Sequence, residues 1–337
     1  MNPVKVFDTG RRILLPVIFV IVCHFISGCG EKKPEVYQVG ILSGAKTFEG
    51  IADGFMDKMS KLGYEEGKNI VYDYQKANFD MDTYRGILER FVNNKVDLIF
   101  AFPTEPALAA KNVTKGKNIP VIFAMAGIER NELVDSISSP GENITGVRYP
   151  GPELTVRRLD ILIELVPKSK RIYLIYDKNY PTTLMALDGL RLAAPSLGIT
   201  LVEDPVNDLD ELKSTLAKRS TSTDIGIDAI LIMPDILNNS PGGFNAILEF
   251  ANKNKLPIGG GMDFTADLGA LFSYVPDNIE QGELAATLAH KILNGTPAGK
   301  IMVMTPRAKL RINYKVIREL ELKVSEGLLS GADEIIR

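Results

Sequence analysis

From residue 36 onward the chain alternates short apolar runs with longer segments whose apolar residues recur every three or four positions. The longer segments predict amphipathic helices, such as the one that carries Ile51, Phe55, Met59 and Leu62 and ends at Gly63. The short runs predict buried strands, at residues 37–42, 70–74, 96–102, 119–124, 171–176, 200–202, 229–233, 257–261, 269–275, 301–303 and 310–312. This repeated strand-loop-helix order predicts parallel sheets with helices on both faces.

Residues 128–152 interrupt this rhythm. They are rich in turn formers, including Ser138, Pro140, Gly141, Pro150 and Gly151. We expect the chain to cross there from one domain to another. The fold class predicted is therefore α/β, with two doubly wound parallel-sheet lobes. Ligands of such sheets lie outside the carboxyl ends of the strands, so two such edges can enclose a cleft.

The first 35 residues follow a different pattern. Lys5, Arg11 and Arg12 precede an apolar run at residues 13–26, which ends in small residues before Cys29. This order is typical of a secretory signal peptide, while the alternative, a transmembrane anchor, needs about 18 or more apolar residues. Residues 26–29 also resemble a bacterial lipobox, which implies a signal peptide at 1–28, cleavage before Cys29, acyl chains on Cys29 and a tether at 29–35.

The composition excludes several kinds of chemistry. The 337 residues include two Cys, two His and no Trp, with a formal net charge of −3. That inventory cannot build a zinc or dithiol motif, and the charge offers no footprint for nucleic acid, so we expect no metal, no cofactor and no nucleic-acid partner. His290 lies within a helical pattern, far from any loop. A carboxylate pair is the remaining enzymatic option.

Two glycine-rich segments resemble phosphate-binding motifs but fail on spacing. Between Gly40 and Gly44 there are three residues instead of four, and Ala45 separates Gly44 from Lys46, so this is not a Walker A loop. What remains is a loop whose N–H groups and hydroxyls can meet an anion, or a plain turn. The glycines at 259–261 lack the spacing of a dinucleotide fingerprint and suggest close backbone approach or a hinge.

Carboxylates and aromatic rings follow the predicted strand ends. Asp177, Asp235 and Asp263 each follow a strand of the second series, as helix caps, turn formers or ligands for a cation. Aromatic residues at or just past strand ends can pack an apolar or aromatic ligand, or belong to the core; they are Phe48, Phe102, Tyr149, Tyr180 and Phe264.

Several segments together resemble one known family, that of ABC-transporter substrate-binding lipoproteins. These segments span nearly all of the chain after residue 35 and lie at 118–123, 139–147, 158–167, 171–177, 269–274, 285–286, 291–295, 310–313 and 332–333. The resemblance implies a type I periplasmic-binding-protein fold, with lobes joined by three crossovers that close on a ligand. It implies a first lobe of residues 36–147 plus about 275–304, and a second of 148–274 plus about 305–337. Some members bind tryptophan or other aromatic amino acids.

Position by position, the resemblance places ligand loops near residues 43–44, 102–105, 124–127, 177–180, 234–235 and 263. The ligand-binding residues expected from all of these arguments are Ser43, Gly44, Phe48, Phe102, Thr104, Met125, Asp177, Tyr180, Asp235 and Asp263. The chain departs from the family pattern after Gly127 and at Ile236, which follows Asp235 where members often have Asn. The ligand can therefore differ from that of amino-acid-binding members.

The function expected is that of an extracytoplasmic, lipid-anchored solute receptor, monomeric and without catalysis. Ser43 and Thr104 would meet the carboxylate of an amino-acid-like ligand, and Asp235 or Asp263 its ammonium. Closure would bury the ligand, and ABC permease and ATPase partners would transport it. The alternatives are a sensing lipoprotein that reports to a membrane receptor, and a lipid-anchored enzyme that uses paired carboxylates.

Overall fold

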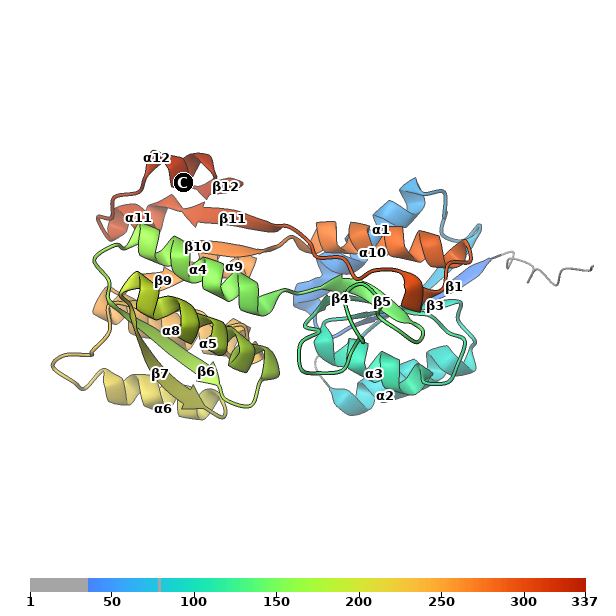
Figure 1. Ribbon diagram of the computed structural model, residues 1–337, viewed down its shortest axis with the longest axis horizontal. Coiled ribbons are helices and arrows are strands. Elements are labelled where there is room, and N and C mark those ends of the chain that lie inside the picture. The colour runs from blue at the N-terminus through green and yellow to red at the C-terminus, as the bar shows by residue number, and fades with distance from the viewer. Residues whose placement is uncertain (1–35, 78–79) are drawn as a thin grey trace, which may run out of the picture. The chain divides into compact units, whose positions relative to one another are not determined.

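The computed structural model describes residues 36–77 and 80–337. The predicted signal peptide, the lipidation site at Cys29 and the tether lie outside these residues. The described chain forms two sheets, each covered by helices on both faces (Figure 1). We call the sheet that starts the chain, with its helices, the first lobe, and the other sheet with its helices the second lobe.

The first lobe has a parallel sheet in the order β2-β1-β3-β4-β5. Its strands are β1 (Tyr37–Ser43), β2 (Ile70–Lys76), β3 (Leu98–Phe102), β4 (Val121–Ala126) and β5 (Ile144–Arg148). Its helices are α1 (Glu49–Lys61) and α10 (Asn278–Leu293) on one face, α2 (Met81–Asn93) and α3 (Thr104–Thr114) on the other, and the short η1 (Lys46–Phe48) and η3 (Ala298–Lys300). Every residue of β3 and β4 is buried, which explains their continuous apolar sequence.

The second lobe has a sheet in the order β12-β11-β10-β9-β8-β6-β7, in which only β11 runs antiparallel to a neighbour, β10. Its strands are β6 (Arg171–Asp177), β7 (Thr200–Val206), β8 (Ala229–Leu231), β9 (Ile258–Gly259), β10 (Phe272–Pro276), β11 (Ala308–Asn313) and β12 (Glu334–Ile336). Its helices are α4 (Gly151–Leu165), α5 (Pro181–Ala193), η2 (Ala194–Leu197), α6 (Leu209–Arg219), α7 (Ile236–Asn239), α8 (Pro241–Asn254), α9 (Asp263–Leu268), α11 (Tyr314–Glu319) and α12 (Glu326–Ser330).

Alternate residues of β6 serve the two faces of this sheet. Ile172 and Leu174 belong to the apolar cluster under α4 and α5, and Tyr173 and Ile175 to the cluster under α6 and α8. Because successive side chains of a strand point to opposite faces of the sheet, this one strand contributes to both halves of the core.

Helices α1 and α10 approach each other at two glycines. A Cβ on Gly54 would lie 2.2 Å from the carbonyl oxygen of Ile279, and one on Gly282 would lie 2.1 Å from that of Ile51. Any side chain there would force the helices apart. Because α10 follows β10 of the second lobe, this contact attaches the returning chain to the first lobe.

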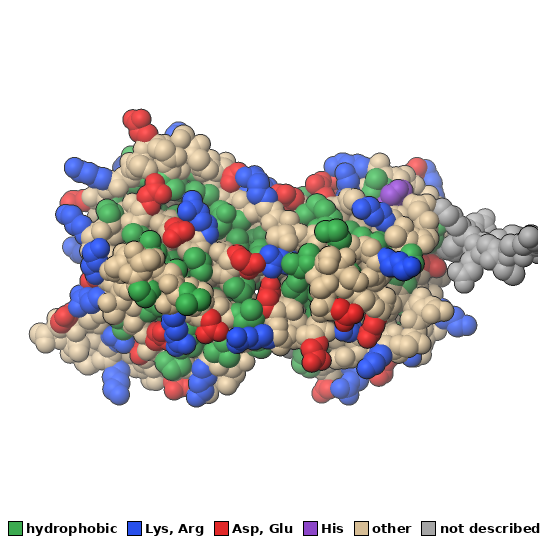
Figure 2. Space-filling model, viewed as in Figure 1, with side chains coloured by type: hydrophobic (Ala, Val, Ile, Leu, Met, Phe, Trp, Pro, Cys, Tyr) green, Lys and Arg blue, Asp and Glu red, His purple; other side chains and the backbone are tan. Residues whose placement is uncertain are grey.

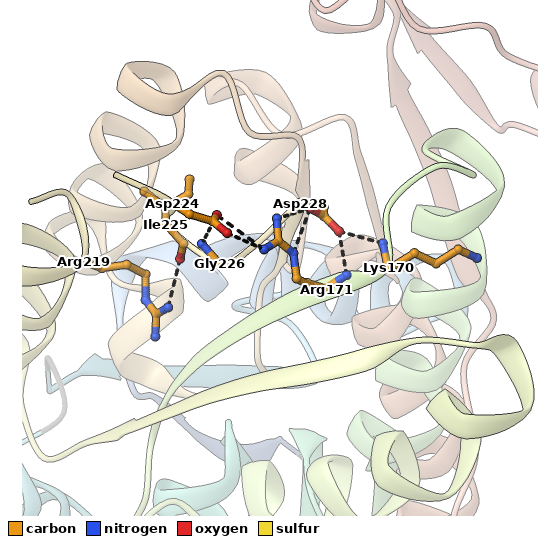
Figure 3. Close-up of polar contacts among 7 residues, drawn as sticks. All are labelled: Lys170, Arg171, Arg219, Asp224, Ile225, Gly226 and Asp228. Carbon is orange, nitrogen blue, oxygen red and sulfur yellow. Dashed lines mark hydrogen bonds and ion pairs between the residues drawn. The ribbon is translucent and has the colours of Figure 1, made fainter. Parts of the chain in front are cut away.

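The amino ends of β6 and β8 are tied together by charged groups (Figure 3). Asp228 accepts hydrogen bonds from the backbone N–H groups of Lys170 and Arg171, each at 2.8 Å, and from the Arg171 guanidinium. Arg171 also pairs with Asp224 at 3.1 Å. These contacts close the end of the second sheet that lies opposite the carboxyl ends of its strands.

Charged side chains of both signs are interspersed over the face of the molecule shown in Figure 2. This mixing agrees with the near-neutral net charge of the sequence. No broad field of one sign covers this face.

Two predictions from the pattern were wrong. Residues 301–303 form no strand; instead a single bridge pairs Met304 with Val147. The segment 128–152, predicted as an interruption, contains β5, whose glycine and flanking turn formers conceal a short strand. The cap of α2 is Asp80, which accepts from the N–H of Thr83.

Candidate functional site

A cavity of about 680 Å³ lies where the carboxyl ends of strands in both sheets meet. The first lobe contributes the loops after β1 and β3, Met125 of β4, and Tyr149 just after β5. The second lobe contributes the loops after β6, β8 and β9. The volume is in the range of ordinary small-molecule sites.

Aromatic and thioether side chains form a substantial part of the cavity wall. They come from both lobes and are Phe48, Met125, Tyr149, Tyr180, Met262 and Phe264. Phe264 also packs edge-to-face against the buried ring of Phe244, with centroids 5.7 Å apart, which fixes its orientation. Such a wall suits a flat apolar group of a ligand.

The loop after β1 and the helical turn that follows it contribute residues 45–48 to the cavity wall. The N–H of Gly44 donates to the carbonyl of Phe102, and that of Phe48 to the carbonyl of Ala45. Between them, Ala45, Lys46 and Thr47 line the cavity, and no backbone carbonyl of the described residues accepts from their N–H groups. The segment 40–47, whose spacing excludes a Walker A loop, is thus a strand end and a short turn that leads into η1.

Polar side chains of α3 join the first lobe to the second. Thr104 lines the cavity, and its Oγ1 accepts from the N–H of Gly127 at 3.0 Å. The next residue, Glu105, accepts at Oε1 from the hydroxyl of Tyr180, at 3.2 Å. Burial raises the pKa of Glu105. Burial, and then the charge of Glu105, raise the pKa of Tyr180 well above its usual value, with smaller contributions from Asp235 and Tyr149.

Asp235 is the buried carboxylate of the cavity wall. It caps α7, since Oδ1 accepts from the N–H of Asn238 at 2.6 Å, and Oδ2 accepts from the N–H of Asp177 at 3.3 Å. Its side chain also accepts from the amide of Asn238 and the hydroxyl of Thr183. Burial nevertheless dominates and raises the pKa of Asp235 to about 6.

Asn239 adds an acceptor beside Asp235. Its amide nitrogen donates to the carbonyls of Met233 and Asp235, each at 2.9 Å. Its Oδ1 is buried and has no hydrogen-bond partner among the described residues. Asn239 and Asp235 both line the cavity, so this end of it is a site for hydrogen-bond donors.

Half of the residues expected at the site line the cavity. The structure brings together Phe48, Thr104, Met125, Tyr180 and Asp235. The aromatic candidates Tyr149 and Phe264 join them. All of them follow or end strands, as the sheet architecture requires.

The other expected residues are not among those that line the cavity. Ser43 is fully buried, and its hydroxyl donates to the carbonyl of Ala45; the adjoining Gly44 packs against Pro103. Phe102 is fully buried against Phe100, with ring centroids 4.8 Å apart. Asp177 accepts from the N–H of Asn179 within its own turn.

Asp263 is also absent from the wall. It begins α9, accepts from the Ser273 hydroxyl at 3.4 Å and lies near Arg311. Burial raises its pKa, while the charge of Arg311 lowers it in part. Its neighbours Met262 and Phe264 are the residues that reach the cavity.

Sequence reasoning missed most of the polar lining from the second lobe. The missed residues are Thr182, Asn239, Ser240 and Asn245. Ser240 caps α8 by accepting from the N–H of Gly243, and Pro241 occupies the first turn. A Ser-Pro pair after a strand is a signal for a helix start, so Ser240 could have been expected at this edge of the sheet.

A cavity between two doubly wound lobes, lined by the carboxyl ends of their strands, defines a two-lobed binding protein of the periplasmic type. The chain belongs to the family of ABC transporter substrate binding proteins, whose model matches residues 39–336. Within the described residues, no helix is long and apolar enough to cross a bilayer.

Known proteins resemble the chain over most of its length. It is 31% identical to a tyrosine-binding protein of Clostridioides difficile (strain R20291), over 80% of this chain and 76% of that protein. A ligand-free, open substrate-binding protein with adhesive properties from Clostridium difficile is 25% identical, with a TM-score of 0.72, covering 89% of this chain and 99% of that one. An ABC domain from Streptococcus pneumonia in complex with L-Trp shares the fold at 24% identity and a TM-score of 0.79, covering 89% of this chain and 100% of that one.

Proposed function

We propose that this protein captures an aromatic amino acid in the cavity between its lobes and delivers it to a membrane permease. The observation that carries the proposal is the composition of the wall, in which aromatic and thioether side chains line the same cavity as a buried carboxylate. The aromatic ring of the ligand would pack among Phe48, Met125 and Phe264. Its ammonium would meet Asp235, with Asn239 as a neighbouring acceptor.

The energetics favour a cationic group at Asp235. Even with its hydrogen bonds, the Asp235 carboxylate is costly to ionise, because burial raises its pKa. A ligand ammonium supplies the missing opposite charge and makes a charge-assisted hydrogen bond. A neutral sugar or a purely apolar ligand would leave that charge unpaired.

The curated relative supports the same ligand class. The tyrosine-binding protein of Clostridioides difficile aligns with 80% of the chain, which includes both lobes. The departures from the family pattern at Gly127 and Ile236 lie beside or in the cavity wall, so selectivity among aromatic amino acids can differ.

Anchoring and transport complete the proposal. The charged start, apolar run and Cys29 of residues 1–29 support export and lipidation outside the cytoplasm. Membership of the ABC substrate-binding family supports a permease and an ATPase as partners. The protein would act as a receptor rather than as an enzyme, by closing its lobes on the ligand.

Thermal unfolding against a metabolite panel tests the ligand class. L-tyrosine, L-tryptophan and L-phenylalanine at about 100 times their Kd should each add roughly 2.7 kcal/mol to the unfolding free energy. Leucine, sugars and nucleosides serve as comparison ligands. A panel in which no aromatic amino acid stabilises the protein would refute the proposal. Recovery of the bound compound in altered form would instead support an enzyme.

A further inference from the structure

A fully buried arginine lies behind the cavity wall. Arg158 of α4 has no exposed surface, although a guanidinium remains charged in proteins. Its Nε donates to the carbonyl of Tyr274 at 2.8 Å, and its Nη2 donates to the hydroxyl of Tyr149 at 3.2 Å. Both partners lie next to crossings between the lobes, after β5 and in β10.

The described residues provide no counter-charge for this guanidinium. None of their ion pairs includes Arg158, and its Nη1 is a buried donor without a partner. Burying an unpaired charge is expensive unless another group compensates for it. The positive charge of Arg158 is therefore unbalanced, and a nearby anion would balance it.

Tyr149 connects this charge to the cavity. Because its hydroxyl oxygen accepts from Arg158, its hydroxyl hydrogen is not used in that bond. No acceptor for this hydrogen occurs among the described residues, and Tyr149 itself lines the cavity. A phenol that accepts from a cation also becomes a stronger donor, through polarisation along the chain of hydrogen bonds.

We propose that Tyr149, oriented and polarised by Arg158, binds the carboxylate of the ligand. This inference rests on the proposed function, that the ligand is an amino acid. The carboxylate takes the place expected at Ser43, whose hydroxyl is bonded within its own loop. Arg158 and Asp235 then bias the cavity with opposite charges, so that a zwitterion binds in one orientation.

Ligands that lack one charged group separate this role from a structural one. Wild-type protein should bind L-tyrosine at least tenfold more tightly than tyramine, which has no carboxylate. Tyr149→Phe should weaken L-tyrosine binding by about tenfold while tyramine binding stays within twofold, so that the ratio of the two Kd values collapses. Isothermal titration calorimetry measures all four constants.

Arg158 acts as a positioning residue, and its variants should reproduce the same selective loss. Arg158→Met should weaken L-tyrosine more than tyramine, and Arg158→Lys should restore part of the preference because it keeps the charge. The double variant Tyr149→Phe/Arg158→Met should bind L-tyrosine no more weakly than the more affected single variant. The losses do not add, because both changes remove the same interaction with the carboxylate. Circular dichroism and thermal unfolding establish whether each variant is folded. If Arg158→Met does not fold, Tyr149→Phe alone tests the carboxylate assignment.

Asp235→Asn is the matched control at the other end of the cavity. It should reduce the preference for L-tyrosine over 3-(4-hydroxyphenyl)propionate, which lacks the ammonium, and leave the preference over tyramine in place. Equal weakening of L-tyrosine and tyramine by Tyr149→Phe would overturn the carboxylate assignment. The assignment would also be overturned if Thr104→Val abolished the preference for L-tyrosine over tyramine and Tyr149→Phe did not. If the wild-type protein binds no aromatic amino acid, the proposed function itself is refuted.

Discussion

The hydroxyl of Tyr180, at the start of α5, donates to Oε1 of Glu105, in the first turn of α3, at 3.2 Å. The two residues belong to different lobes, and Tyr180 also lines the cavity. Burial raises the pKa of both groups, so this hydrogen bond lies in an environment where water competes weakly. It joins the two lobes at the edge of the cavity.

Removing this link should weaken ligand retention. Tyr180→Phe leaves Glu105 without its partner across the lobes, and we expect a loss of about fivefold to thirtyfold in affinity, mainly through faster dissociation. Stopped-flow displacement of bound L-tyrosine measures the rate. Tyr176→Phe is the control, because the hydroxyl of Tyr176 also donates to a glutamate, Glu203, but lies outside the cavity wall. Equal dissociation rates in the two variants would contradict the prediction.

Stability should depend on pH through Asp235. Its pKa rises to about 6 on folding, so the folded state holds this proton more tightly than the unfolded state. The stabilising contribution is complete below about pH 4 and is lost as the pH rises through 6. The unfolding free energy of wild type relative to Asp235→Asn should fall by on the order of 3 kcal/mol from pH 4 to pH 7. Urea titrations at four pH values provide the measurement. A difference that stays constant with pH would show that Asp235 does not titrate in this range.

Ligand affinity should change with pH in the opposite direction. An ammonium binds the ionised form of Asp235, so affinity for L-tyrosine should decline by up to about tenfold per pH unit below 6. Asp235→Asn should bind weakly at every pH, with no such decline. Glu105→Gln should keep the decline, because Asp235 still titrates in that variant. Unchanged wild-type affinity from pH 7.5 to pH 5 would separate Asp235 from the ammonium.

The contact between α1 and α10 should not tolerate a methyl group. Gly282→Ala places a Cβ 2.1 Å from the carbonyl of Ile51, and we expect a loss of about 2–4 kcal/mol of stability. Gly86→Ala is the control within a helix, since its Cβ meets nothing within 4 Å; it should stabilise the protein by about 0.5–1 kcal/mol. Chemical denaturation of both variants gives the comparison. A Gly282→Ala protein as stable as wild type would mean that the helices can separate at little cost.

The periodic pattern predicted most of the elements because parallel strands buried on both faces have continuous apolar sequences. It failed where an element is short or contains turn formers, as in β5 and α7. The edge of each sheet that lines the cavity was also predictable, since it is formed by the carboxyl ends of the strands. The direction of individual side chains at that edge was not, since Ser43 and Phe102 end adjacent strands and both point into the core.

Arg158 could have been recognised from the sequence as unusual, although its contacts could not have been predicted. It lies four residues from Leu154 and from Leu162, on the apolar face of its helix, where a charged residue is out of place. That position could have marked it as unusual. Its connection to Tyr149 depends on the packing of α4 against the crossing after β5, which no local pattern describes.

The close packing of α1 on α10 has a consequence for biosynthesis. The hydroxyl of Tyr37 donates to the carbonyl of Leu293, 256 residues later in the chain. A ribosome therefore releases α1 long before α10 exists. The part of α1 that packs against α10 stays uncovered while the second lobe is made. Completion of the first lobe therefore waits for a helix that is made after most of the second lobe, and contacts of such long sequence separation form slowly.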